Sequence, residues 1–273
     1  MTPRNRPTLA AAGAMIWLVV AIAPIYLMVV TSLRRQDAYQ SASALNPAAG
    51  ATFDNYARVW HKGFVQFTMN SATVVLATVV LVVLTALPAA YGLVRNDTRA
   101  LRLVFPLFLF GLAIPAQAVI VPIYLIITRM RLYDSLAAII LPTAAFSVPM
   151  SIVVLTSTLR NVPKELYEAM AVDGASPARV FARLVVPLGR SGIVTVVIFS
   201  GLNAWNGFLF PLVLTQSPGT RVLPLGLWNF QNQYGTDVPG LMAAAVFSAL
   251  PVLVLYLFGR RHLLRGLTAG FGQ

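Results

Sequence analysis

The chain has 273 residues, of which 58% are hydrophobic and 10% charged, with 20 Lys and Arg against 8 Asp and Glu. A soluble globular protein carries about 25% charged residues, so this composition excludes a disordered chain, a nucleic-acid-binding domain and an ordinary soluble enzyme. The sequence contains no cysteine, which excludes disulfides, thiol chemistry and a cysteine-based metal site.

Six long stretches carry no charged residue: Pro7–Leu33, Gly63–Val94, Leu103–Thr128, Ser135–Leu159, Ser191–Thr220 and Val238–Gly259. Each is long enough for one membrane-spanning helix of about 20 residues. The apolar runs are continuous and do not alternate with polar residues, which favours helices over a β-barrel. We therefore predict an all-α membrane protein with a single transmembrane domain over residues 1–273 and spans near 9–32, 66–93, 104–127, 136–158, 192–214 and 239–259. The first apolar run is longer than a signal-peptide core, so we expect it to be retained.

The distribution of basic residues predicts the orientation of the six spans. With both termini in the cytoplasm, 13 of the 20 Lys and Arg residues lie on the cytoplasmic side and 7 on the outer side. Cytoplasmic loops carry the excess of Lys and Arg in membrane proteins. We therefore expect both termini to be cytoplasmic.

The uncharged stretches also lack histidine. Ion-coupled carriers keep ionisable residues at mid-membrane, so a proton-driven carrier is disfavoured. Neither Lys62 nor Lys164 follows the glycine pattern of a phosphate-binding loop. We expect a chain that is not an enzyme and binds neither metal nor cofactor, and whose transport energy comes from elsewhere.

Residues 162–187 differ from the apolar spans because they are mixed in charge. Pro163 suits the start of one short helix, Gly174 suits its end, and Ser176 followed by Pro177 suits the start of a second. Two apolar stripes accompany them: Leu166, Tyr167, Met170 and Ala171, then Val180, Phe181, Leu184 and Val185. The sequence predicts a helix–Gly–helix hairpin on the cytoplasmic side between spans four and five, either lying on lipid headgroups or docking into a cytoplasmic partner.

The hairpin residues carry a family resemblance. Glu168-Ala169-Met170-Ala171-Val172-Asp173-Gly174-Ala175, followed by Phe181, Leu184 and Pro187-Leu188, resembles the EAA loop of ABC-transporter permease subunits. Met170 stands where the motif has its third Ala, and Val186 where Leu is usual. Further segments resemble permeases of binding-protein-dependent sugar importers, in family order: Phe53-Asp54-Asn55-Tyr56, Asn70-Ser71, Pro88-Ala89-Ala90-Tyr91, Ile120–Tyr124, Asn161–Leu166, Ala204–Phe210 and Arg265–Gly270.

The resemblance implies an importer in the inner membrane of a bacterial or archaeal cell. Its parts would be this chain, a second permease forming a heterodimer with it, two ATPase subunits that use ATP–Mg, and an external solute-binding protein; the lipid bilayer surrounds the two permeases, and no nucleic acid takes part. The resemblance further implies that the hairpin seats in the ATPase through six residues: Glu168, Ala169, Asp173, Gly174, Phe181 and Pro187. Glu168 would meet a basic group there, or alternatively pair with Lys164 along its own helix.

Polar and aromatic residues within the spans are candidates for the sugar path. Asn203 and Asn206 follow Ser200 on roughly one face of span five, Trp205 offers a ring for stacking, and Gln117 is a weaker candidate in span three. The alternatives are asparagine as a helix–helix contact and tryptophan as a packing or interfacial residue. A phosphorylated solute would need basic residues on the path, and the uncharged stretches offer none, so a neutral sugar is favoured.

The outer loop 216–237 is rich in amides and aromatic rings. Trp228, Asn229, Gln231 and Asn232 are candidate contacts to the solute-binding protein, or else they belong to a solvated loop. Two alternatives to a sugar permease stay open: a permease of the same type for another small solute, and a stand-alone six-span channel or carrier that works without ATP.

Overall fold

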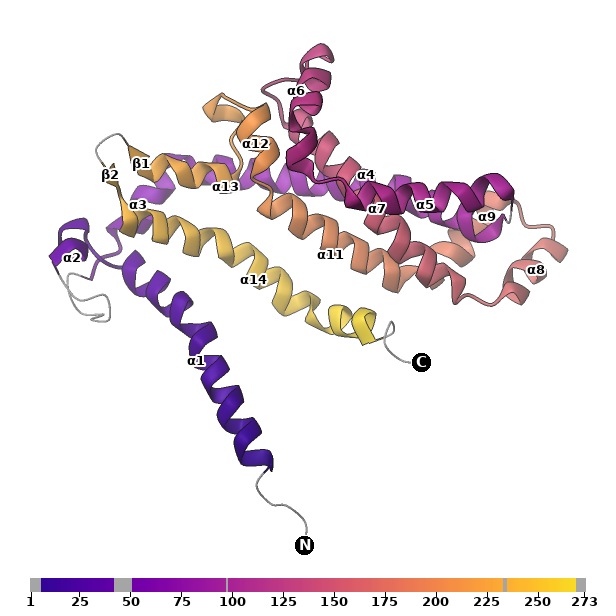
Figure 1. Ribbon diagram of the computed structural model, residues 1–273, viewed down its shortest axis with the longest axis horizontal. Coiled ribbons are helices and arrows are strands. Elements are labelled where there is room, and N and C mark those ends of the chain that lie inside the picture. The colour runs from indigo at the N-terminus through magenta and orange to yellow at the C-terminus, as the bar shows by residue number, and fades with distance from the viewer. Residues whose placement is uncertain (1–5, 42–50, 97, 233–234, 269–273) are drawn as a thin grey trace, which may run out of the picture. The chain divides into compact units, whose positions relative to one another are not determined.

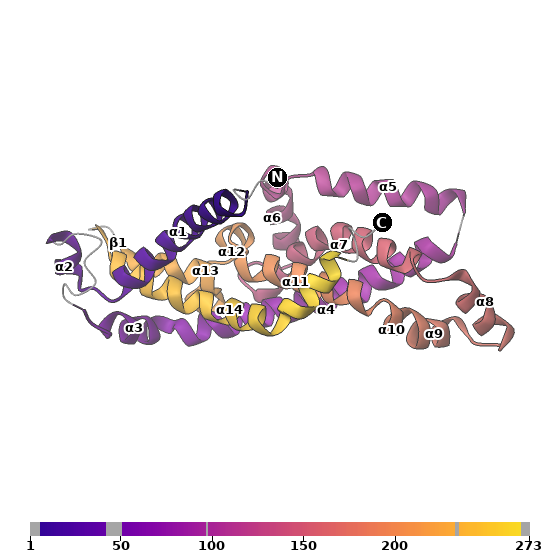
Figure 2. The same ribbon diagram turned by 90° about the horizontal axis from the view of Figure 1, so that it is seen from below.

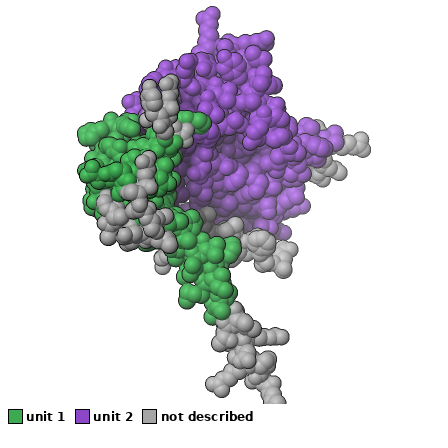
Figure 3. Space-filling view, turned by 60° about the vertical axis from the view of Figure 1, so that its left-hand side comes forward, with its two compact units in different colours: residues 1–65, 226–251 green, residues 66–225, 252–273 purple. Residues whose placement is uncertain are grey.

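The computed structural model of the chain describes residues 6–41, 51–96, 98–232 and 235–268. These residues fall into two compact units, coloured green and purple in Figure 3. Unit 1 combines Met1–Val65 with Gly226–Pro251, and unit 2 combines Gln66–Leu225 with Val252–Gln273.

Almost all of the described chain is helical, as predicted (Figure 1). In unit 1 the elements are α1 (Arg6–Ser32), α2 (Gln36–Ser41), α3 (Asp54–Val59), the π-helical turn η1 (Trp60–Phe64), the 3-10 turn η5 (Leu227–Phe230), the two-residue strands β1 (Gln231–Asn232) and β2 (Gly235–Thr236), and the start of α14 (Val238–Thr268). In unit 2 they are α4 (Val65–Arg95), α5 (Arg99–Ala113), η2 (Ala116–Val119), α6 (Ile120–Arg129), α7 (Leu136–Arg160), α8 (Lys164–Val172), α9 (Pro177–Val180), the π-helical turn η3 (Phe181–Val185), α10 (Val186–Leu188), α11 (Arg190–Asn206), α12 (Leu209–Leu214), η4 (Pro218–Thr220) and α13 (Leu223–Gly226). Strands β1 and β2 pair antiparallel, with Gln231 opposite Thr236.

In unit 1 a polar network holds three helix ends together. Asn55 is 1% exposed, and its amide donates to the carbonyls of Ser32 at 2.7 Å and Arg34 at 2.6 Å, at the end of α1. Arg58 donates to the Asn55 side-chain oxygen and forms an ion pair of 2.8 Å with Asp237. Asp237 in turn accepts the backbone N–H of Gly240 in the first turn of α14. Because a buried carbonyl without a partner is costly, this network fixes where α1 ends.

The apolar surface of α1 itself is largely exposed, with Trp17 74% and Ile16 67% exposed. A soluble protein does not leave such a helix uncovered, because burial of apolar surface drives folding. The exposed apolar helix agrees with the membrane span that the sequence predicts there.

The core of unit 2 is built around α4, α7 and α11. Val82, Ala86 and Ala90 of α4 are buried with Leu155 and Leu159 of α7 in one cluster, and Val196 of α11 belongs to the same cluster. Helices α7 and α11 approach closely at Gly192, where an added Cβ would lie 2.5 Å from the Thr158 hydroxyl oxygen. Small residues permit such close packing of membrane helices.

Two predicted spans of unit 2 are broken. The third predicted span, 104–127, divides into α5 and α6, which meet at an angle of 91°. Ile114 is extended at the break because the residue before a proline, here Pro115, is disfavoured in the helical region. The fifth, 192–214, divides into α11 and α12 at Gly207 and Phe208, and a second bend of 74° separates α10 from α11.

Three described helices are long and apolar enough to cross a membrane alone: Ala10–Ser32, Asp54–Arg95 and Leu136–Arg160. Two bent helix pairs, Leu103–Ala113 with Ala116–Arg129 and Pro177–Leu188 with Arg190–Asn206, raise the number to five if each counts as one span, and Val238–Leu253 is a shorter apolar helix. The all-helical membrane fold is thus confirmed in outline, whereas the count of six spans and the single domain over residues 1–273 stay predictions.

Candidate functional site

The predicted hairpin is present in unit 2 as α8, followed by α9, η3 and α10. Gly174 adopts φ +69°, a left-handed conformation that glycine tolerates best. Its N–H donates to the Ala171 carbonyl at 3.0 Å, and the Ala175 N–H donates to the Met170 carbonyl at 2.9 Å. This pair of bonds is the Schellman motif, which closes a helix at glycine. The Ser176 hydroxyl then accepts the Arg179 N–H and caps the second helix, whose first residue is Pro177.

The apolar face of the hairpin packs on the chain itself. Tyr167, Val180, Leu184 and Val185 are buried in the same cluster as Val82 and Leu155. Phe181 packs against this cluster, with its ring centroid 5.8 Å from that of Tyr91. The stripes predicted from the sequence are therefore largely internal contacts, and Leu166 and Ala171 are the members that stay exposed.

The opposite face of the hairpin is exposed. It presents Glu168, Ala169, Asp173 and Gly174, with Val172 88% exposed at the turn. Pro187 is exposed in α10. Among the described residues no ion pair joins Glu168 to Lys164. Of the six candidate coupling residues, five are thus exposed, whereas Phe181 is half-buried.

An aromatic cluster attaches the hairpin to the end of α4. The rings of Tyr91 and Tyr167 stack with centroids 6.3 Å apart, and the guanidinium of Arg95 lies 5.1 Å from the Tyr167 ring centroid. Burial raises the pKa of the Tyr167 phenol, nearby Tyr91 raises it further, and Arg95 opposes both effects. The Tyr167 hydroxyl is buried and has no hydrogen-bond partner among the described residues. Stacking of the two tyrosine rings and the contact of Arg95 with the Tyr167 ring, and not a hydrogen bond of the Tyr167 hydroxyl, hold α8 against the end of α4.

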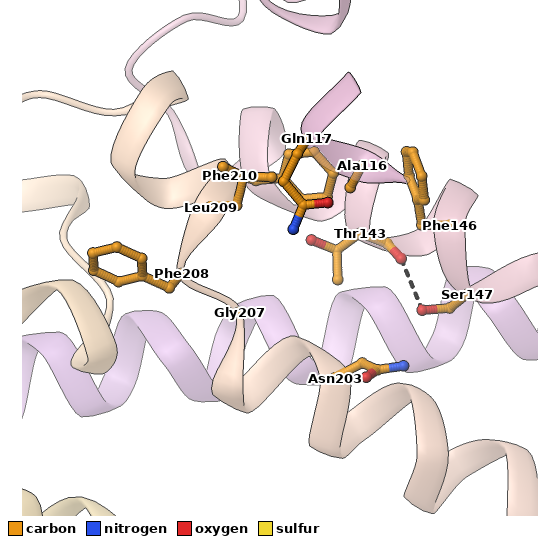
Figure 4. A pocket seen from close by; sticks show the side chains of 10 residues that line it. All are labelled: Ala116, Gln117, Thr143, Phe146, Ser147, Asn203, Gly207, Phe208, Leu209 and Phe210. Atoms are coloured by element: carbon orange, nitrogen blue, oxygen red, sulfur yellow. Dashed lines mark hydrogen bonds between the residues drawn. The ribbon is translucent and has the colours of Figure 1, made fainter. Parts of the chain in front are cut away.

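A pocket of about 390 Å³ lies where the two broken spans of unit 2 approach α7 (Figure 4). Gln117 comes from η2 and Asn203 from the last turn of α11. The remaining lining residues are Ala116, Thr143, Phe146, Ser147, Gly207, Phe208, Leu209 and Phe210. The pocket is neutral and aromatic, with the rings of Phe146 and Phe210 5.7 Å apart.

The polar groups that line the pocket differ in the hydrogen bonds that they can still form with a solute. The hydroxyl of Thr143 donates to the Ile139 carbonyl at 2.7 Å, and that of Ser147 to the Thr143 carbonyl at 2.8 Å, so both keep acceptor lone pairs only. Gln117 and Asn203 are exposed, and neither amide has a hydrogen-bond partner in the part of the chain described. Each amide can therefore both donate to and accept from a solute hydroxyl.

The four path candidates differ in where they lie relative to the pocket. Gln117 and Asn203 line it, whereas Trp205 and Asn206 do not. The Asn206 amide donates to the Leu202 carbonyl of its own helix at 2.9 Å. Thr143, Phe146 and Ser147 of α7 were not among the candidates. The sequence signal for Thr143 and Ser147 is a repeat of small hydroxyl residues every four positions, which is also typical of helix–helix contacts. Phe146 has no such signal.

A loop in unit 2, residues 215–222, is held by side chains from two other elements. Asp134 adopts φ +58° and accepts the backbone N–H of Gln216 at 2.8 Å, the N–H of Ser217 at 2.9 Å and the Thr220 hydroxyl at 2.8 Å. These donors hold the pKa of the Asp134 carboxyl well below its usual range, with the Gln216 N–H contributing most. From α4, the Asn70 amide donates to the carbonyls of Gly219 and Arg221.

The candidate contacts to a binding protein lie in unit 1. Trp228 is 51% exposed in η5. Asn229, Gln231 and Asn232 have side chains outside the described residues. No group of three or more His, Cys, Asp or Glu that could hold a metal ion occurs in the described ranges.

Comparisons with known proteins agree with this architecture. Residues 82–268 match the family described as "Binding-protein-dependent transport system inner membrane component". The chain is 37% identical over 255 residues to the ABC transporter permease protein ORF2 of Caldicellulosiruptor sp. (strain Rt8B.4), covering 93% of each. It is 30% identical over 270 residues to the diacetylchitobiose uptake system permease protein NgcG of Streptomyces coelicolor, covering 98% of this chain and 89% of the relative.

A solved structure shares the fold. It is the crystal structure of a bacterial ABC transporter that imports the acidic polysaccharide alginate, with a TM-score of 0.81, 19% identity, and coverage of 96% of this chain and 98% of that one. The resemblance first seen in the EAA-like hairpin is therefore confirmed. The chain belongs to the family of inner-membrane permease components of binding-protein-dependent transport systems.

Proposed function

We propose that this chain forms half of the membrane path of an ATP-driven importer for a neutral sugar or oligosaccharide. Six spans cross the membrane: α1, α4, the pair α5–α6, α7, the pair α11–α12, and α14. Both termini and the hairpin of α8 to α10 lie in the cytoplasm. Loop 215–222 and the strands β1 and β2 lie outside, where a solute-binding protein approaches.

The observation that carries the proposal is the two-sided character of the hairpin. One face is buried in the core of unit 2 through Tyr167, Leu184 and Val185. The other face exposes Glu168 and Asp173, with the apolar Val172 at the turn. Such a surface fits a groove that has a basic rim and an apolar floor. In this assignment the groove belongs to an ATPase subunit, and Gly174 provides the turn that enters it.

The pocket between the broken spans supplies the solute contacts. Its two free amides and the acceptor oxygens of Thr143 and Ser147 suit sugar hydroxyls, and its phenylalanine rings suit the apolar face of a sugar. No ionisable side chain lines it. This favours a neutral sugar such as the diacetylchitobiose named for one relative, in contrast to the acidic alginate named for the structural relative.

The proposed mechanism is alternating access. ATP binding closes a pair of ATPase subunits, which moves the hairpin of this chain and that of a second permease. The permease pair then opens outward, takes the sugar from the binding protein, and returns inward after hydrolysis. Differential binding of ATP to the two states is the only source of the shift.

Reconstitution tests the proposal. The complete complex of both permeases, ATPases and binding protein is placed in liposomes, and uptake of radiolabelled diacetylchitobiose and other neutral disaccharides is measured with and without ATP. We expect uptake only with ATP and binding protein, and a loss of about tenfold or more in Gly174→Pro, which introduces a residue restricted to negative φ. Uptake by this chain alone, or full uptake by Gly174→Pro in a complex that still assembles, would refute it. Preferential uptake of a uronic-acid disaccharide would refute the assignment of a neutral sugar.

A further inference from the structure

Helix α4 contacts the hairpin at one end and loop 215–222 at the other, and the proposed mechanism requires the hairpin to move. At the end that leads to α5, the rings of Tyr91 and Tyr167 stack and Arg95 lies over the Tyr167 ring. Figures 1 and 2 show α8 and α9 beside this end of α4. The hairpin is therefore attached to α4 by a direct contact, although the chain connects the hairpin only to α7 and α11.

The other end of α4 holds loop 215–222. The Asn70 amide donates to the Gly219 carbonyl and to the Arg221 carbonyl, both at 2.8 Å. Gln66 donates to the Gly219 carbonyl at 3.3 Å, and the Ser71 hydroxyl accepts the Leu223 N–H at 2.8 Å. Gln66 and Asn70 of α4 thus hold the backbone of this loop, and Ser71 holds Leu223, the residue that follows it.

Between its two ends α4 is continuous. It runs from Val65 to Arg95, which corresponds to about 45 Å at 1.5 Å per residue. Val74, Thr78, Val82 and Ala86 are buried along its length. A packed, continuous helix is a rigid element that can carry a displacement from one end to the other.

Loop 215–222 is held by a second element as well. The Asp134 carboxylate, in the turn between α6 and α7, accepts the N–H groups of Gln216 and Ser217. Asp134 also accepts the Thr220 hydroxyl, next to the Gly219 and Arg221 carbonyls that Asn70 holds. A displacement of α4 relative to α7 would therefore act on neighbouring loop residues that different elements hold, and would change the conformation of the loop.

We infer that α4 transmits movement of the hairpin to loop 215–222, with Tyr167 and Asn70 as the positioning residues at its two ends. The inference rests on the proposed function, in which the hairpin contacts an ATPase subunit. The binding protein would then sense the nucleotide state through the loop.

A cysteine reporter tests the inference directly, because the chain has no cysteine of its own. Gly219→Cys places the reporter in the loop, where an added Cβ meets nothing within 4 Å. In the reconstituted complex, the rate at which a membrane-impermeant maleimide modifies this chain is measured without nucleotide and with ATP and vanadate. We expect the two rates to differ by at least about threefold. Equal rates would overturn the inference.

Variants at the two ends of α4 then separate transmission from local stability. In Tyr167→Leu we expect the nucleotide-free rate to stay unchanged and the difference between states to fall below about 1.5-fold. Tyr167→Phe should retain the difference, because it keeps the ring and removes only an unpartnered hydroxyl. Asn70→Leu should raise the rate in both states and remove the difference, whereas Thr73→Val, whose hydroxyl bonds only to its own helix at Met69, should resemble the parent. An undiminished difference in Tyr167→Leu would overturn the inference.

If Tyr167→Leu does not fold, Tyr91→Leu takes its place in the test. This variant removes the other ring of the stack, and we expect the same reporter rates from it. The proposed function is tested separately, by measuring ATP-driven uptake in Gly174→Pro. If that variant loses ATP-driven uptake while the reporter rates stay equal in the parent, coupling through the hairpin stands and transmission through α4 fails. If Gly174→Pro transports fully, the proposed function itself fails.

Discussion

The carboxylate of Asp134 accepts the backbone N–H of Gln216 at 2.8 Å, across 82 positions of the sequence. Asp134 also accepts bonds from Ser217 and Thr220, so a single side chain bonds three residues of the turn that follows α12. This relationship leads to a prediction about pH.

The stability contributed by Asp134 should be lost in acid. Its folded pKa lies below the ordinary value of 3.8, chiefly because of the Gln216 N–H, so the contribution is present above 3.8 and disappears as pH falls through the folded pKa. We expect Asp134→Ala to melt at a lower temperature than the parent, by a constant margin from about pH 8 to about pH 5. The margin should shrink below pH 3.8, which thermal unfolding in detergent can follow. A margin that widened in acid would contradict this account.

Gly174 should tolerate Asn better than Ala. An added Cβ at Gly174 meets nothing within 4 Å, so the cost of substitution comes only from its φ of +69°. For an ordinary L-residue that cost is about 1–2 kcal/mol, and less for Asn, whose side chain bonds locally in this conformation. We expect ATP-driven uptake to fall in the order Gly, Asn, Ala. Equal uptake by the Ala and parent complexes would show that the left-handed turn is not needed.

Asn203 and Asn206 form a matched pair for testing the pocket. Asn203 lines the pocket with its amide free among the described residues, whereas Asn206 donates to its own helix at Leu202. We expect Asn203→Ala to raise the KM for sugar uptake several-fold, since one or two hydrogen bonds of about 0.5–1.5 kcal/mol each are lost. Asn206→Ala should leave KM within about twofold. The reverse ranking would place the sugar path elsewhere.

Asn55 should be needed for stability more than for transport chemistry. Its amide satisfies two carbonyls at the end of α1 from a buried position. Asn55→Leu removes both donors and should destabilise the protein by about 1–3 kcal/mol, seen as a lower melting temperature. Asn96→Leu is the control, because its exposed amide bonds only to Gly92 one turn earlier. Equal melting temperatures for the two variants would argue against the network.

Gly192 should resist enlargement. The added Cβ would meet three atoms of Thr158 at 2.5 to 3.1 Å, so α7 and α11 would have to separate. We expect Gly192→Ala to cost about 1–3 kcal/mol and Thr158→Ala to restore part of it, as measured by thermal unfolding. Gly92→Ala, where nothing lies within 4 Å, is the control. A neutral Gly192→Ala would mean that the two helices are not in close contact.

The helical fold and the hairpin were predictable because the signals for both act locally. Long uncharged runs require helices in a membrane, since backbone groups have no water to bond. Gly174, Ser176 and Pro177 act on their own backbone, so their positions mark the turn and cap of the hairpin directly. The breaks at Pro115 and Gly207 were harder to predict, because proline and glycine also occur inside continuous membrane helices, as Pro88 does in α4.

What the sequence determined by itself is the class of protein: a membrane chain with one polar hairpin and no ionisable group in its apolar runs. Only the tertiary structure decided which polar groups line the pocket. Asn203 and Asn206 look alike in sequence, yet the break at Gly207 leaves one amide free in a pocket and the other bonded within its own turn. Likewise the apolar stripe of the hairpin gives no sign of which surface covers it, because burial depends on the distant residues of α4 and α7 that fold against it.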